Sequence, residues 1–124
     1  MKLFNRDEAY KLTDDLLSAI KNRGQGTLEA FEITPAIYDE IFEELERSGE
    51  IVANLTPPPY SVAFKPDVTG RIPFACYETE ADTHTYRIAC QLWAGGIKTD
   101  LTLIADYTEE QGTPALAFRL LETQ

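Results

Sequence analysis

The N-terminal segment of the chain places its apolar residues at helical spacing. Asn5 followed by Glu8 has the spacing of a capping box, in which side chains satisfy free amides at the start of a helix. The apolar positions that follow share one stripe, formed by Ala9, Leu12, Leu16 and Ile20. We predict a first helix that ends near Gly24, because glycine readily terminates a helix.

A second helix is predicted to begin at Thr34 and Pro35. Threonine accepts hydrogen bonds from unpaired helix amides, and proline is tolerated at the first helical position. The apolar stripe of this helix consists of Ile37, Ile41 and Leu45, with Tyr38 and Phe42 beside it. We expect the helix to run to about Ser48 and to stop at Gly49. Residues 25–31 are compatible with a short helix or with a turn.

The second half of the chain has the composition and alternation of strands. Residues 51–55 are predicted as a short strand, and the three prolines at 57–59 must lie at a sheet edge or in a connection. Residues 60–64 are candidates to resume that strand. Further strands with hairpin-length connections are predicted at residues 72–78, 84–93, 101–107 and 115–121.

These elements predict an α+β fold in a single domain of residues 1–124, with a helical part at 1–50 and a sheet part at 51–124. Two N-terminal helices are expected to pack on one face of a mainly antiparallel meander sheet with four to five strands.

The alternation in each strand assigns side chains to the two faces of that sheet. In the strand at 84–93, Tyr86 belongs to the core stripe, whereas Arg87 and Trp93 face the other way. In the last strand, one face is predicted to carry Leu116, Phe118 and Leu120. The opposite face is predicted to carry Ala117, Arg119 and Leu121.

Charge narrows the classes of partner. The chain has 21 acidic and 11 basic residues, with a net charge of −10. Such a surface repels nucleic acid backbones and anionic lipids and favours a basic protein partner. No apolar run has the length of a membrane span, and the N-terminus lacks the apolar region of a signal peptide, so we expect a cytoplasmic protein without a membrane partner.

The acidic residues gather on the predicted second helix. They are Asp39, Glu40, Glu43, Glu44 and Glu46. Carboxylates so close together repel one another, which suggests a surface that meets a basic protein or imitates nucleic acid. An ordinary solvated helix face is the alternative. Arg87 and Trp93 are candidate anchors, since arginine and tryptophan dominate binding hot spots; alternatively, Trp93 belongs to a second, minor core.

Residues with reactive side chains are few, and we assign no catalytic residue, metal or cofactor. The single histidine, His84, follows Glu80 and Asp82, and a surface position at a hairpin end explains it most simply. The same acidic segment lacks the glycine and distal glutamate of a calcium loop. Cys76 and Cys90 are interpreted as buried packing residues, with a cross-strand disulfide or a reactive thiol as alternatives.

Two segments resemble known patterns. Leu92-Trp93 followed by Lys98-Thr99-Asp100-Leu101-Thr102-Leu103 resembles an LW…[KR][ST]DLTL strand-turn-strand signature of small uncharacterised bacterial proteins, which implies a bacterial protein and supplies no catalytic residue. Residues 45–64 are similar to the end of a recognition helix and the wing of a winged-helix protein. The acidic face of the second helix argues against insertion of that helix into DNA.

Three functional hypotheses follow. The first is a non-enzymatic acidic protein-binding module, of an inhibitor or immunity type, that docks on a basic partner such as a nuclease. The second is a regulatory winged-helix-like domain that binds nucleic acid or a small effector through the sheet. The third is a small enzyme that uses His84 together with Glu80 or Asp82 in a shared homodimer site. The sequence does not indicate the oligomeric state.

Overall fold

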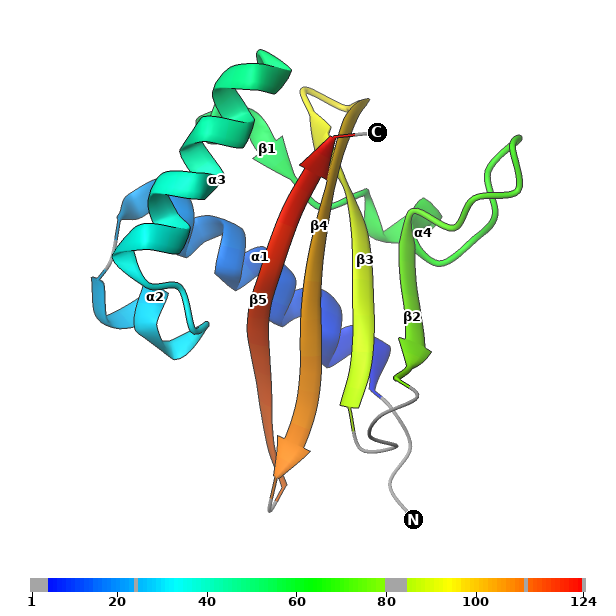
Figure 1. Cartoon of the computed structure of the whole chain (residues 1–124). Helices are drawn as coiled ribbons and strands as arrows, with labels where there is room; N and C mark the ends of the chain where they lie inside the picture. The colour runs from blue at the N-terminus through cyan, green and yellow to red at the C-terminus, as the bar shows by residue number, and fades with distance from the viewer. Residues whose placement is uncertain (1–4, 24, 80–84, 111, 124) are drawn as a thin grey trace.

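The computed structural model describes residues 5–23, 25–79, 85–110 and 112–123. It has an α+β fold in which the N-terminal helices pack against a mainly antiparallel five-stranded sheet (Figure 1). The predicted fold class is therefore confirmed.

The two long helices begin at the predicted caps, and α3 also ends at its predicted stop, whereas α1 ends at Asn22 with Arg23 as its C-cap, one residue before the predicted Gly24. Helix α1, Arg6–Asn22, is capped by the Asn5 side chain, which accepts a hydrogen bond from the Glu8 amide. Helix α3, Pro35–Ser48, is capped by Thr34 and ends at Gly49, whose φ of 78° is readily adopted by glycine. Between them, the segment left open by the sequence forms the short helix α2, Gln25–Ala30.

The cap of α3 yields a testable prediction. The Thr34 hydroxyl accepts from the Ile37 amide at 3.2 Å, so Thr34→Ala leaves a helix amide without its protein partner. We expect the free energy of unfolding to fall by about 1 kcal/mol. Urea denaturation measures the change, and Thr34→Ser, which keeps the hydroxyl, is the matched control. Equal stabilities of the alanine and serine variants would show that the cap contributes nothing.

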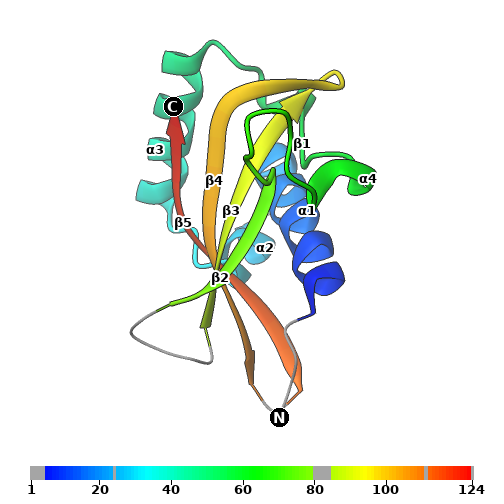
Figure 2. The same cartoon turned by 90° about the vertical axis from the view of Figure 1, so that its right-hand side faces the viewer.

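Five strands form the sheet, and the order across it is β1-β3-β4-β5, with β2 paired to the same edge of β3 as β1 but further along it. The strands are β1, Leu55–Thr56; β2, Phe74–Glu78; β3, Thr85–Ala94; β4, Ile97–Glu110; and β5, Thr113–Thr123. Every pairing is antiparallel. Figure 2 shows that the sheet twists strongly and that β4 bends over next to the β3–β4 hairpin.

The core lies between the helices and one face of the sheet, here called the inner face. Strands β3, β4 and β5 supply most of the buried residues of this face: Ile88, Cys90, Leu92, Leu101, Leu103, Ala105, Leu116 and Phe118. Helix α1 passes behind the sheet in Figure 1, and α3 lies alongside the edge strand β5. The buried α3 residues Ile41 and Leu45 reach the same core.

The segment after α3 differs from the prediction. Residues 52–54 form a single 3₁₀ turn, η1, Val52–Asn54, and only Leu55–Thr56 is a strand. Residues 60–63, predicted to resume the strand, form helix α4, Tyr60–Ala63. Pro59 begins this helix, and its carbonyl accepts from the amides of Val62 and Ala63. The likeness to the wing of a winged-helix protein required residues 60–64 to form a returning strand. That prediction is wrong.

The face assignment at the end of β5 is also wrong. The pairing of β4 with β5 shifts register between Ile104 and Ala105, where an extra β5 residue is accommodated. Beyond such a bulge the alternation reverses. As a result Leu120, predicted to share a face with Leu116 and Phe118, is 43% exposed, whereas Leu121, predicted on the opposite face, packs against the core with them.

Candidate functional site: a groove between α3 and β5

A groove of about 340 Å³ separates α3 from the edge strand β5. Its α3 wall is formed by Glu40, Ile41, Glu43, Glu44 and Arg47. Its β5 wall is formed by Phe118, Arg119, Leu120 and Leu121. The structure thus brings three of the predicted partner-binding glutamates to one groove, because residues three and four apart on a helix share a face.

Two of these glutamates, Glu40 and Glu43, are exposed and make no ion pair with any described residue. Glu44 is different, because its carboxylate accepts hydrogen bonds from Thr123 and Arg47. The hydrogen bond from Thr123, followed by that from Arg47, lowers the pKa of Glu44. Glu44 therefore ties α3 to β5, whereas Glu40 and Glu43 keep exposed carboxylates at the groove.

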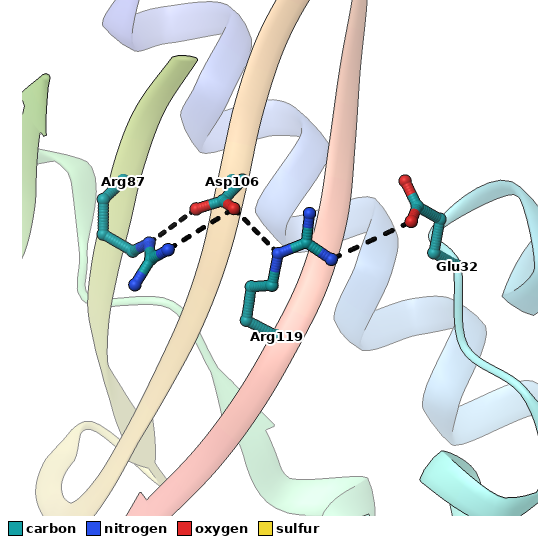
Figure 3. A network of polar contacts seen from close by, with 4 residues as sticks. All are labelled: Glu32, Arg87, Asp106 and Arg119. Atoms are coloured by element: carbon teal, nitrogen blue, oxygen red, sulfur yellow. Dashed lines mark hydrogen bonds and ion pairs between the residues drawn. The ribbon is translucent and has the colours of Figure 1, made fainter. Parts of the chain in front are cut away.

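Arg119 also borders the groove, but its guanidinium group forms ion pairs with two carboxylates (Figure 3). Its Nε lies 2.7 Å from Asp106 Oδ2, and its Nη1 lies 3.8 Å from Glu32 Oε1. Asp106 is shared with Arg87, whose Nε lies 2.5 Å from Asp106 Oδ1. This four-residue cluster has two positive and two negative charges and is neutral overall. The net charge of the groove is therefore set by Glu40 and Glu43.

Asp106 is the centre of this cluster on the outer face of the sheet, the face opposite the core. Its side chain is only 10% exposed. Burial acts to raise the pKa of the Asp106 carboxyl, but the hydrogen bonds from Arg87 and Arg119 outweigh burial and lower it. The same contact with Asp106 raises the pKa of Arg87. Asp106 and Arg87 are therefore both charged at neutral pH.

The two predicted anchors are not brought together. Arg87 lies opposite Asp106 and is connected to the groove only through Asp106 and Arg119. Trp93 lies six residues further along β3, beside Thr56 and Lys98 of the neighbouring strands. Trp93 is partly buried, and its Nε1 has no hydrogen-bond partner among the described residues. Neither residue lines the groove.

Asp39 is exposed on α3 but borders a different hollow. That hollow, of about 310 Å³, lies between α3 and the segment around α2, with Leu28 and Ile33 among its apolar residues and Arg23 and Glu29 among its charged ones. Asp39 therefore lines the hollow beside α2, whereas Glu40 and Glu43 line the groove beside β5.

Other candidate residues contribute little to a site. His84, Glu80 and Asp82 lie outside the described residues. Both cysteines are free, and they are not directly opposed, because Cys76 pairs with Ile88 and Cys90 with Phe74. Burial raises the pKa of the Cys76 thiol to about 12, and it also raises the pKa of Cys90. Neither thiol is a ready nucleophile, since the thiolate is the reactive form.

Sequence reasoning missed Arg119 and Asp106. The available signal was the alternation of the last strand, which had placed Arg119 on the face opposite Phe118. The cross-strand register Arg87 to Asp106 was needed to recognise an ion pair, and the β5 bulge was needed to bring Arg119 beside them. Register of this kind depends on pairing between strands and is weakly encoded in any one strand.

Fold and groove together define a class: an α+β domain with an acidic helix beside an open sheet edge. Comparison of the chain with protein-family models, curated proteins and solved structures gave no match. In the part of the chain that the structure describes, no helix combines the length and apolar character needed to cross a membrane.

Proposed function

We propose that this chain is a non-enzymatic protein-binding module that docks a basic partner protein on α3, in the manner of an inhibitor or immunity-type protein. The observation that carries the proposal is the α3–β5 groove, where the carboxylates of Glu40 and Glu43, which form no ion pair with a described residue, line the same hollow as the accessible apolar side chains of Leu120 and Leu121. Lysine and arginine side chains complement both parts, because each has an apolar stem and a cationic head.

The surrounding charges support this choice of partner. The chain has a net charge of −10, which accelerates encounter with a cationic protein and disfavours nucleic acid. Arg119 and Arg47 do not reverse the local sign, since both contact carboxylates. In this proposal Arg87 positions Asp106 and, through Asp106, Arg119. Two free cysteines are consistent with action in the reducing cytoplasm.

A displayed library of random peptides tests the proposal without knowledge of the partner. Peptides selected on the immobilised protein are expected to be enriched in arginine and lysine, and their affinity should fall as salt rises. Glu40→Gln combined with Glu43→Gln should weaken binding about tenfold, since each exposed charge pair contributes modestly. Isothermal calorimetry with a synthetic copy of a selected peptide measures the change.

The control is a variant with the same change in net charge outside the groove, Asp14→Asn combined with Glu122→Gln. Both residues are exposed, and neither lines the groove. This variant should bind the peptide as the parent chain does. Equal losses in the two variants, or selected peptides without basic residues, would refute docking at the α3–β5 groove.

A further inference from the structure

The β5 wall of the groove is a strand edge. Side chains of successive strand residues point to opposite faces of a sheet, so one face of a strand supplies only alternate residues. Phe118, Arg119, Leu120 and Leu121 nevertheless all line the groove. The bulge at Arg119 interrupts the alternation, and the hollow runs along the strand edge, so four consecutive residues line it. This edge is available because β5 is last in the strand order.

One backbone amide of this edge is already hydrogen-bonded to a segment outside the sheet. The Phe118 amide donates to the Phe31 carbonyl at 2.9 Å, which shows that β5 amides can point away from β4. Beyond Phe118, within the described residues, no backbone hydrogen bond links the edge to another segment of the chain. An edge with unpaired amides and carbonyls is a template for an added strand.

The two walls have matching lengths. From Glu40 to Arg47 a helix rises about 10 Å, at roughly 1.5 Å per residue. From Phe118 to Leu121 a strand rises about 10 Å, at roughly 3.4 Å per residue. Each wall of the groove is therefore as long as about three extended residues.

Resting on the proposed function, we infer how the partner is held: a short extended segment of the basic partner adds to the free edge of β5, with arginine or lysine side chains at alternate positions reaching Glu40 and Glu43. Backbone hydrogen bonds to β5 then provide the docking geometry, and the glutamates of α3 provide the preference for basic residues. The arrangement uses both walls of the groove.

A second copy of this chain is a poorer occupant of the edge. Its own β5 has one basic residue in the segment that would enter, Arg119, and that residue is engaged by Asp106. Pairing two β5 strands would also bring two acidic α3 helices together in molecules with a net charge of −10 each. A basic segment from another protein meets no such repulsion.

The inference is tested with a selected basic peptide and a series of copies that are N-methylated at one backbone amide each. Only alternate amides of an added strand point at the edge, so methylation should weaken binding at least about tenfold at alternate positions of the bound residues and much less at the positions between them. Amide hydrogen exchange of residues 119–121 should slow when the unmodified peptide binds.

The outcomes separate this inference from the proposed function. Binding that depends on Glu40 and Glu43, with no alternating effect of N-methylation and unchanged exchange at residues 119–121, would overturn strand addition and leave docking of a basic partner intact. Failure of all basic peptides to bind would remove both. Concentration-dependent protection of residues 119–121 without peptide would identify a second copy as the occupant and overturn the inference.

Discussion

Replacing Phe74 with alanine is expected to lower the free energy of unfolding by about 3–5 kcal/mol, the range for removal of a buried aromatic ring. Phe74 is 1% exposed, and its ring centroid lies 5.7 Å from that of Tyr10 and 5.4 Å from that of Phe64. Its ring thus joins α1, the end of α4 and the start of β2, so its loss leaves a cavity between three elements.

Chemical denaturation measures this effect, and Ile72→Ala is the matched control. Ile72 stands two residues upstream and is 40% exposed, so its truncation should cost less than about 1 kcal/mol. The prediction also bears on α4, because Tyr60 at its start and Phe64 at its end both pack against Tyr10. A loss for Phe74→Ala no larger than that for Ile72→Ala would contradict the packing of this aromatic cluster.

Asp106→Asn should cost about 2–3 kcal/mol at neutral pH, because it removes charged hydrogen bonds to two arginines while keeping the shape of the side chain. The buried position of Asp106 explains why the expected loss exceeds that of a surface ion pair, and the partial exposure of Arg87 and Arg119 keeps it below that of a fully buried pair. Asp100→Asn, at an exposed position of β4, is the control and should change little.

The pH dependence of this loss has a defined sign. The pKa of Asp106 is lowered in the folded chain, so its stabilising contribution is fully present above the unfolded value of about 3.9 and is lost as pH falls through the folded pKa. The difference in stability between the parent chain and Asp106→Asn should therefore shrink below about pH 4. Glu44 and Asp67 also have lowered pKa values, but both variants retain them, so they cancel in the difference. A difference that stays constant down to strongly acidic pH would show that the charge of Asp106 is not the cause.

Asp106→Asn also bears on the groove. In this variant a neutral amide replaces the Asp106 carboxylate, which lies 2.7 Å from the Nε of Arg119. Arg119 then presents more positive charge to the α3–β5 groove. A basic peptide should bind this variant more weakly than it binds the parent chain, although Asp106 lies outside the groove lining.

Local signals in the sequence were sufficient to predict the start of α1 and both ends of α3. Asn5, Thr34 and Gly49 act within one turn of the residues they cap, so their effect can be read without knowing the rest of the fold. The same holds for the acidic stripe of α3, since helical spacing alone places Glu40, Glu43 and Glu44 on one side. By contrast, residues 60–63 have an aromatic and β-branched composition typical of strands, and packing of Phe64 against Tyr10 and Phe74 outweighs that preference.

The sequence by itself determined the start of α1, both limits of α3, the α+β class and the gathering of negative charge on α3, because each depends on residues that are neighbours along the chain. Only the tertiary structure decided that β5 is the free edge, that its bulge turns Leu121 inward and leaves Leu120 exposed, and that Asp106 neutralises Arg119 next to the glutamates. These features depend on strand order and register, which arise from pairing between residues far apart in sequence. The acidic stripe becomes one wall of a groove only because that pairing leaves the edge of β5 beside it.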